Sequence, residues 1–281
     1  MGDSLTRGYA ASEHWPLADA YPAKLGANYP YLTVNNQGYV GYTTDEIRLR
    51  TGSLSLVVKP QGGQIPASGT VNLETAQVIG WGGSTSLTLT GVLNGVPGTI
   101  SRTPSSLTFT RAAAGNAVSM AGPAPFVATG DDFSASTIVL WAGRNDVNQN
   151  IKGPHPSVAE HVVSSVLDLV EWLTPRCKSI VVLGTSNSVD EPSTTTKYET
   201  VKTINERLAQ LLPHKYADIR TYLVHQAIHD VGITPTQADI DNMAADAPPP
   251  SIWDTGSHYL KPVAEHVAGF VGNHLAAKGY I

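Results

Sequence analysis

The middle of the chain differs in composition from both ends. Between about residues 54 and 129, serine, threonine, glycine and valine dominate and charged side chains are rare. Polar and apolar residues alternate over residues 86–90 and 106–110, which is the pattern of strands buried on one face. Asn94 and Gly95, between two apolar runs, are a hairpin-turn signal. The pattern predicts an inserted antiparallel β module, a small sandwich or barrel, over residues 53–130.

The two flanking regions have the alternating pattern of an α/β domain. Short apolar runs of the buried-strand type lie at residues 137–141, 179–183 and 219–224. Apolar side chains with helical spacing lie at residues 157–173 and 194–212, and a proline start marks helices near residues 21–26 and 262–277. Strands that alternate with helices form parallel sheets covered on both faces. We therefore expect a flavodoxin-like three-layer α/β/α domain with a mostly parallel sheet, made of residues 1–52 and 131–281.

Composition argues against several classes of protein. The chain has 281 residues, 41% of them apolar, and a formal net charge of −5. This mild acidity argues against a nucleic-acid partner, which requires a basic face. The sequence has no apolar run of about 18 residues, which argues against a membrane span. The single cysteine, Cys177, excludes an internal disulfide. His225 and His229 stand four apart without an evident third ligand, so we expect no metal site and no cofactor.

Near the N-terminus, Ser4 follows a glycine and an aspartate. Taken alone, a serine after aspartate is more often a turn or helix-cap residue than a nucleophile. A serine hydroxyl becomes a nucleophile when a base lies in hydrogen-bond reach, another group orients the base, and donors hold the oxyanion. Later stretches supply such groups, because Gly41 and Asn145 follow strand-like runs and Asp254 and His258 lie close to the C-terminus.

These stretches resemble the blocks of the SGNH (GDSL-type) serine esterases and lipases. The family is named after four residues in four separated blocks, and this chain has them in the same order as Ser4, Gly41, Asn145 and His258. The blocks span nearly the whole chain. The resemblance implies that Ser4 is the nucleophile and His258 the general base. It also implies an oxyanion hole made by the backbone N–H groups of Ser4 and Gly41 and the side-chain amide of Asn145.

Two features depart from the family pattern. The last block is usually Asp-x-x-His, whereas Asp254 lies four residues before His258 and Thr255 holds the usual place. We expect Asp254 to orient His258, and the alternative is a Ser–His dyad whose imidazole is held by a backbone carbonyl. Family members also have a buried apolar strand before the Gly-Asp-Ser turn, where this chain has only Met1. Of the two explanations, a chain cut from a longer protein is favoured over a missing strand, since the loss of a central strand should be very costly.

Arg144 stands between Gly143 and Asn145, at the third block. A guanidinium group binds carboxylates and other anions with two parallel hydrogen bonds. Arg144 is therefore a candidate for binding an anionic group of the substrate. Pairing with Asp3 or Asp146 is the favoured interpretation.

The tryptophans are candidates for stacking on sugar rings. Trp253 is adjacent to Asp254 and is the first choice for a wall of the site. Trp81 and Trp15 are further candidates. Trp141 lies in a predicted strand, so we expect it in the core.

The expected function is that of a serine esterase for short-acyl esters, acetyl esters on carbohydrate above all. No long apolar lid is evident, and a Ser/Thr-rich β insertion with exposed aromatic residues suits contact with a glycan. The alternatives are a lipase or acyl-thioesterase with the same machinery, and a non-catalytic glycan-binding module of a phage tail or cell-surface protein. With His258 as the base, the rate is expected to fall below the imidazole pKa, about 6.5 if unperturbed.

The inserted module has two interpretations of equal weight. It is either a wall or binding platform beside the site, or a spacer or assembly surface. Family members with such insertions resemble domains of phage tail proteins and cell-surface enzymes. By this analogy we expect a small-molecule or glycan ester as substrate, a larger multidomain or phage tail protein as context, and an extracellular, cell-surface or virion-associated location.

Overall fold

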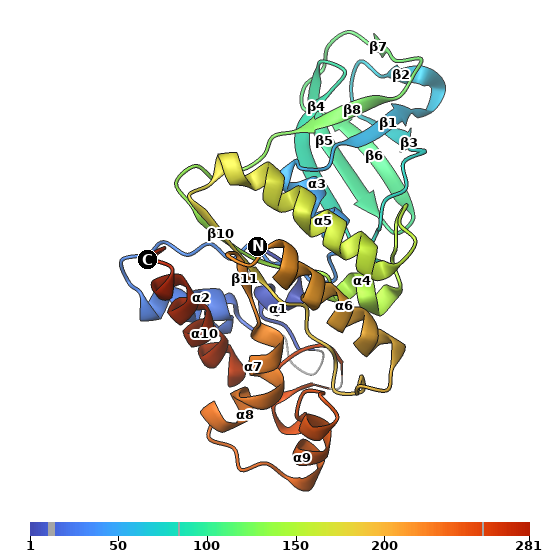
Figure 1. Ribbon diagram of the computed structural model, residues 1–281. Coiled ribbons are helices and arrows are strands. Elements are labelled where there is room, and N and C mark those ends of the chain that lie inside the picture. The colour runs from blue at the N-terminus through green and yellow to red at the C-terminus, as the bar shows by residue number, and fades with distance from the viewer. Residues whose placement is uncertain (11–14, 84, 255) are drawn as a thin grey trace.

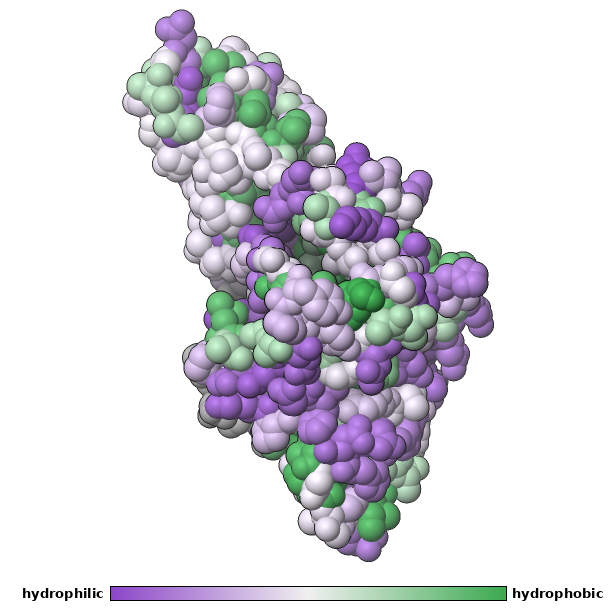
Figure 2. All heavy atoms as spheres, turned by 90° about the vertical axis from the view of Figure 1, so that its left-hand side faces the viewer, coloured by the Kyte–Doolittle hydropathy of each residue, from purple (hydrophilic) through white to green (hydrophobic). Residues whose placement is uncertain are grey.

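The computed structural model describes residues 1–10, 15–83, 85–254 and 256–281. It contains a β-barrel at one end and a mixed α/β part that carries both termini (Figure 1). In the space-filling view the barrel is a narrow projection from the wider α/β part (Figure 2). Within the described residues, no helix is long and apolar enough to span a bilayer.

The barrel is closed and antiparallel, with the strand order β1-β3-β6-β5-β4-β8. Its strands are β1 (Leu56–Pro60), β3 (Thr70–Glu74), β4 (Leu87–Leu93), β5 (Val96–Thr103), β6 (Ser106–Arg111) and β8 (Ala124–Ala128). A separate short pair joins β2 (Gln64–Ile65) to β7 (Val118–Ser119). Buried and exposed residues alternate along all of β4, so Leu87, Leu89 and Leu93 point into the barrel.

The β4–β5 hairpin turns at the two residues that the sequence indicated. Asn94 and Gly95 both have positive φ, 47° and 79°, as a two-residue hairpin turn with the correct twist requires. Inside the barrel, Gly91 of β4 lies opposite Gly98 of β5. A Cβ atom at Gly98 would lie 2.4 Å from the ring of Phe109, so glycine makes room there for an aromatic side chain.

The predicted fold class is wrong. We expected a flavodoxin-like three-layer α/β/α fold with a mostly parallel sheet, but the largest sheet is the six-stranded antiparallel barrel. Within the described residues the parallel sheet has three strands in the order β11-β10-β9: β9 (Thr137–Trp141), β10 (Ser179–Leu183) and β11 (Tyr216–Ala217). The molecule is therefore a mixed α/β protein in which the interrupting segment forms the dominant sheet.

The third predicted strand, residues 219–224, is also wrong, because this run forms helix α7 (Ile219–His225). The side chain of Asp218 caps the helix by accepting hydrogen bonds from the backbone N–H of Thr221 at 3.1 Å and from its hydroxyl at 2.7 Å. An apolar run of this length is compatible with a buried strand or a buried helix turn. Here the Asp218 cap favours the helix.

The backbone of residues 1–2 lies beside β9 in parallel orientation. The amino nitrogen of Met1 donates to the carbonyl of Val139 at 2.6 Å, and the N–H of Trp141 donates to the carbonyl of Met1 at 3.1 Å. On its other side, Gly2 pairs with Gly38, again in parallel. The chain thus runs between β9 and Gly38 and delivers the next residues to the end of the sheet.

The helices cover the parallel sheet on two sides. The helix pair α2 (Tyr21–Asn28) and α10 (Val263–Ala277) packs on one side, and α3 (Thr44–Thr51), α5 (Val158–Leu173) and α6 (Thr196–Leu211) pack together on the other. The shorter helices are α1 (Ser4–Arg7), α4 (Arg144–Gln149), α8 (Ala227–Asp230) and α9 (Gln237–Ala244), and short 3₁₀ turns are η1 (Leu17–Asp19), η2 (Gln61–Gly63), η3 (Thr174–Arg176) and η4 (Pro250–Ile252).

The hydrophobic core has two bodies. One runs from the interior of the barrel, past Ile47 and Leu49 of α3, to the side of the sheet that α5 and α6 cover. The other lies under α2 and α10. Since the first body is continuous across the junction, the barrel and the α/β part share a core.

Enlarging Gly98 is expected to destabilise the barrel. In a Gly98→Ala variant the new methyl group would meet the Phe109 ring and the Thr110 carbonyl oxygen at 2.4 Å. Overpacking of this kind should lower the free energy of unfolding by about 2 kcal/mol, measured by denaturant titration. The control is Gly122→Ala, where a Cβ atom meets nothing within 4 Å, and which should change stability by less than about 0.5 kcal/mol. Equal stabilities of the two variants would contradict the packing described.

Candidate active site

Ser4 and His258 meet at the carboxyl end of the parallel sheet. Ser4 is the first residue of α1, directly beyond the paired Gly2, and its side chain is buried. The Nε2 atom of His258 lies 2.7 Å from Ser4 Oγ. The two residues are 254 positions apart in sequence, so the fold itself brings the hydroxyl and the imidazole into hydrogen-bond distance.

The residues that follow Ser4 and His258 are tied together. The Tyr259 hydroxyl donates to the carbonyl of Leu5 at 2.7 Å, and both side chains are almost completely buried. The Tyr259 ring lies parallel to that of Trp141 at the end of β9, with centroids 6.1 Å apart. Tyr259 thus fixes the distance between the serine helix and the histidine loop. Sequence analysis missed Tyr259, although an aromatic residue directly after the candidate histidine is a signal that could have found it.

Burial controls the protonation of His258. It lowers the pKa of the imidazole to about 4, an effect that the charge of Asp254 opposes and the charge of Arg144 supports. A neutral imidazole accepts a proton through one nitrogen and donates through the other. At neutral pH, His258 is therefore unprotonated at one nitrogen and can accept the proton of the Ser4 hydroxyl.

Asp254 lies in the same loop as His258. Its backbone N–H donates to the backbone carbonyl of His258 at 2.7 Å, which closes the loop, and its charge raises the pKa of the imidazole. The Nδ1 atom of His258 is buried and makes no hydrogen bond with the residues that the structure describes. Thr255, the residue at the family's usual position for the acid, lies outside the described residues. The choice between triad and dyad stays a prediction.

Asp3 stabilises the turn that presents Ser4. One carboxylate oxygen accepts a hydrogen bond from the backbone N–H of Leu5 at 2.9 Å, which caps α1. Burial raises the pKa of Asp3 to about 7. Asp3 therefore acts on the backbone of this turn.

Asn145 contacts the backbone at residues 41–42, named the Gly41 segment below. Its side-chain amide donates to the backbone carbonyl of Tyr42 at 2.9 Å. An amide nitrogen carries two N–H groups, and this bond uses one of them. Gly41 has φ of +80°, a conformation that favours glycine. The two residues that the sequence nominated for the oxyanion hole are thus held side by side.

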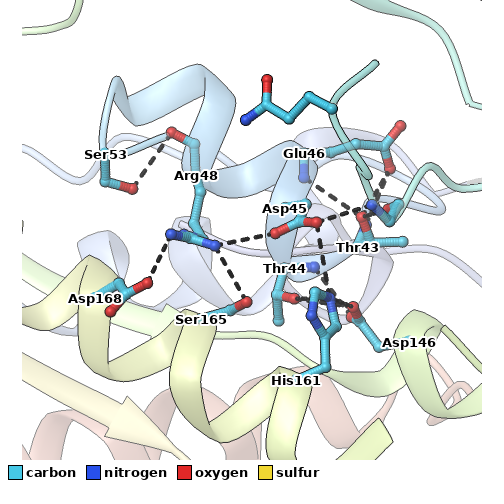
Figure 3. Close-up of polar contacts among 12 residues, drawn as sticks. Thr43, Thr44, Asp45, Glu46, Arg48, Ser53, Asp146, His161, Ser165 and Asp168 are labelled. Atoms are coloured by element: carbon cyan, nitrogen blue, oxygen red, sulfur yellow. Dashed lines mark hydrogen bonds and ion pairs between the residues drawn. The ribbon is translucent and has the colours of Figure 1, made fainter. Parts of the chain in front are cut away.

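A buried polar cluster beside Asn145 supports its contact with Tyr42 (Figure 3). Asp146 is completely buried and accepts hydrogen bonds from the Thr44 backbone N–H at 3.0 Å and the Thr44 hydroxyl at 2.9 Å. His161 of α5 approaches Asp146 at 3.4 Å and Asp45 at 3.8 Å. Burial acts to lower the pKa of His161, but the hydrogen bond to Asp146 and the two carboxylate charges outweigh it and raise the pKa. A protonated His161 would balance these buried carboxylates.

The segment between β3 and β4 packs directly on the Gly41 segment. Glu46 of α3, fully buried, accepts hydrogen bonds from the backbone N–H of Gly82 at 3.2 Å and from the Thr85 hydroxyl. Arg102 of β5 donates to the carbonyls of Gly82 and Thr85 at 3.0 and 2.8 Å. A Cβ atom at Gly82 would lie 2.7 Å from the Gly41 carbonyl oxygen, so the two backbones are in close contact. The segment that connects β3 to β4 therefore packs against the backbone of Gly41.

Arg144 has a different partner from those predicted. Its guanidinium group is buried and forms an ion pair with Glu191 at 2.7 Å, rather than with Asp3 or Asp146. Because Glu191, the Ser186 carbonyl and the Asn148 side chain occupy this guanidinium, a role in binding an anionic substrate is not supported. Glu191 was missed because nothing in the sequence links two residues 47 positions apart in different segments.

The tryptophans also require correction. Trp253 is buried, and its indole N–H donates to the Gly256 carbonyl at 3.1 Å, so it packs in the core instead of forming a solvent-facing sugar platform. Trp15 is buried as well, and Trp141 lies in the core as expected. Trp81 is partly buried, on the segment beside Gly41, with the Arg102 guanidinium 4.9 Å from its ring centre. Its contact with substrate stays a prediction.

Among the described residues, no group of three or more histidine, cysteine, aspartate or glutamate side chains is placed to hold a metal ion. His225 Nε2 lies 3.1 Å from the carboxylate of Asp246. This contact gives His225 a role in an ion-pair cluster with Asp246 and Arg220, whose guanidinium lies 2.8 Å from the same carboxylate.

No model of a known protein family matches the sequence, and no curated protein matches it. Among solved structures, the chain is similar to a lipolytic protein of the G-D-S-L family from Desulfitobacterium hafniense DCB-2, with 12% identity, 98% of this chain and 97% of that chain covered, and a TM-score of 0.49. It is similar to a G-D-S-L family lipolytic protein from Veillonella parvula DSM 2008, with 14% identity, coverage of 87% and 92%, and a TM-score of 0.43.

A third similar structure is described as a peptidoglycan O-acetylesterase, with 12% identity, coverage of 98% of this chain and 89% of that chain, and a TM-score of 0.39. The family named for the first two proteins is the family that the four sequence blocks resemble.

The titration of His258 can be measured directly. Because burial disfavours the charged imidazolium, the imidazole should titrate with a midpoint near pH 4 in NMR spectra of the ring nitrogens. The resonance is assigned by its loss in a His258→Gln variant. A midpoint near 6.5, the value of an exposed histidine, would contradict the burial described.

Proposed function

We propose that the chain is an SGNH (GDSL-type) serine esterase that hydrolyses short-acyl esters, acetyl esters of carbohydrates above all, through an acyl-enzyme. One observation carries the proposal, namely the 2.7 Å contact between Ser4 Oγ and His258 Nε2. A hydroxyl and a neutral imidazole at this distance are the nucleophile and base of acyl transfer. The Gly41 segment and Asn145, held together by the Tyr42 contact, support the assignment of the oxyanion donors.

In the proposed reaction, Ser4 Oγ attacks the ester carbonyl carbon while His258 Nε2 takes the hydroxyl proton. The carbonyl oxygen becomes an oxyanion, which the backbone N–H groups of Ser4 and Gly41 and the amide of Asn145 stabilise. His258 then gives its proton to the leaving alcohol, and the C–O bond breaks. Water, activated in the same way by His258, hydrolyses the acyl-enzyme and restores Ser4.

The low pKa of His258 suits the role of a base that is neutral when substrate binds. A base must be unprotonated in the free enzyme, so kcat/KM should be level at neutral pH and fall as the pH drops through the imidazole pKa. Sequence analysis placed this fall near 6.5 for an unperturbed imidazole. Burial of His258 moves it to about pH 4.

In the proposed mechanism Asp254 stabilises the imidazolium by its charge. The carboxylate raises the pKa of His258, which means that it favours the protonated state formed during the reaction. This role does not require a hydrogen bond at Nδ1. Loss of Asp254 should therefore cost less activity than loss of Ser4 or His258.

The preference for carbohydrate esters is supported by the barrel segment beside the proposed oxyanion hole. Trp81 lies on this segment, next to the close contact between Gly82 and Gly41. A partly exposed indole ring is a surface on which a sugar ring can stack. The same proximity favours a wall beside the site over a distant spacer as the role of the barrel.

Replacing the nucleophile or the base should abolish hydrolysis of p-nitrophenyl acetate. Ser4→Ala and His258→Ala should each lower kcat by at least about 10³-fold, and Asp254→Ala by less. A fluorophosphonate probe should label the wild type but not Ser4→Ala. The control is Ser165→Ala, which removes another buried hydroxyl, on α5, and should keep both activity and labelling. Wild-type activity of Ser4→Ala would overturn the proposal and favour a binding module.

Removal of the Asn145 amide should slow the chemical step. Asn145→Ala should lower kcat by about 10²- to 10³-fold with little change in KM, because the lost donor acts on the transition state. The matched control is Asn242→Ala, which removes an amide bonded to the carbonyls of Val189 and Pro248. A rise in KM with unchanged kcat would show instead that Asn145 binds the ground state.

A further inference from the structure

Arg144 is the centre of a buried hydrogen-bond network outside the set of reacting groups. Its guanidinium forms two parallel hydrogen bonds to Glu191, at 2.7 and 2.9 Å, and a third to the Ser186 carbonyl at 2.8 Å. Arg144 and Glu191 are both almost completely buried. A bidentate pair of this kind fixes both side chains in one orientation.

The first branch of the network runs through Asn148, one turn further along α4. The guanidinium of Arg144 donates to the side-chain oxygen of Asn148. Because arginine cannot accept a hydrogen bond, this contact fixes which end of the amide faces outward. The Asn148 amide nitrogen then donates to the hydroxyl of Ser257 at 2.8 Å. Ser257 is the residue directly before His258.

The second branch runs through Glu191 to the other side of the same loop. The carboxylate of Glu191 accepts a hydrogen bond from the backbone N–H of Ser188 at 2.9 Å. The Ser188 hydroxyl in turn donates to the carbonyl of Gly256, which also accepts the indole N–H of Trp253. Both residues that precede His258 are therefore held by groups from outside their loop.

The loop that carries His258 determines where its imidazole lies relative to Ser4. Within the described residues, Nδ1 has no hydrogen-bond partner, and the Tyr9 ring meets the imidazole in a T-shaped contact with centroids 5.2 Å apart. We propose that Arg144, acting with Glu191 and Asn148, is the positioning unit that holds His258 Nε2 at Ser4. This inference rests on the proposed function, in which His258 is the general base.

The network links the two halves of the proposed machinery. Arg144 is adjacent in the chain to Asn145, the proposed oxyanion donor, and both belong to the first turn of α4. A displacement of this turn would move the oxyanion donor and the loop of the base together. Arg144 is thus a positioning residue, since its guanidinium bonds to Glu191, the Ser186 carbonyl and Asn148.

The test uses the branch to Ser257, since replacement of Arg144 would leave the buried Glu191 carboxylate unpaired and endanger folding. Asn148→Ala and Ser257→Ala should each lower kcat for p-nitrophenyl acetate by about 10- to 100-fold with unchanged KM, because a small misplacement of the base slows the chemistry. Ser257→Thr keeps the hydroxyl and should restore most of the rate. The controls, Asn242→Ala and Ser251→Ala, remove an amide and a hydroxyl bonded elsewhere and should behave like the wild type.

A double-mutant cycle separates positioning from general destabilisation. In a His258→Ala background, the residual rate should not change when Asn148→Ala or Ser257→Ala is added, because each acts through His258. A further loss of the same size in that background would overturn the inference, as would wild-type kcat in both single variants. The Ser4→Ala variant is measured in the same assay, and full activity of this variant would refute the proposed function. If Ser4→Ala is inactive while Asn148→Ala and Ser257→Ala are fully active, this inference alone is refuted.

Discussion

The site depends first on the hydrogen bonds between the buried Asp146 carboxylate and Thr44. A carboxylate buried without partners would cost several kcal/mol, so the pairing of Asp146 with both donors of Thr44 strongly constrains the two segments. The contact joins residues 102 positions apart and closes the long excursion that the chain makes through the barrel. It brings Asn145 to the Tyr42 carbonyl and so determines where two of the proposed oxyanion donors lie.

The barrel is coupled to this junction through both apolar and polar contacts. Its interior is continuous with the core around α3, and the carboxylate of Glu46 on α3 holds the segment that leads into β4. A buried carboxyl group that loses its hydrogen-bond donors destabilises the fold, because nothing then replaces its lost hydration. Loss of the barrel would leave Glu46 without the Gly82 and Thr85 donors and would uncover the backbone of Gly41. The barrel is therefore better regarded as a structural component of the site than as an attached module.

Much of the local structure could be predicted from the sequence, but less of the long-range arrangement. The helical spacing of apolar residues in α5 and α6 and the turn residues Asn94 and Gly95 are local features of the sequence. The structure has both helices and the turn. The prediction of a strand at residues 219–224 was wrong, because a short apolar run does not distinguish a strand from a helix. The cap at Asp218 favours the helix that the structure has there. Ser4 and His258 could be nominated because their blocks are short patterns. The partner of Arg144 and the burial of Trp253 depend on packing between distant segments, which local patterns do not record.

Three consecutive residues at the start of α4 reach three different parts of the site. Successive side chains on a helix point about 100° apart, so Arg144, Asn145 and Asp146 diverge from one turn. Arg144 supports the loop of the base, Asn145 reaches the Gly41 segment, and Asp146 binds α3. The turn can lie so close to its neighbours because Gly143 precedes it with φ of +105°, and a Cβ atom there would lie 2.8 Å from the Thr185 hydroxyl. The position of this turn thus affects both the loop of the proposed base and the proposed oxyanion donor, which links the placement of His258 to that of Asn145.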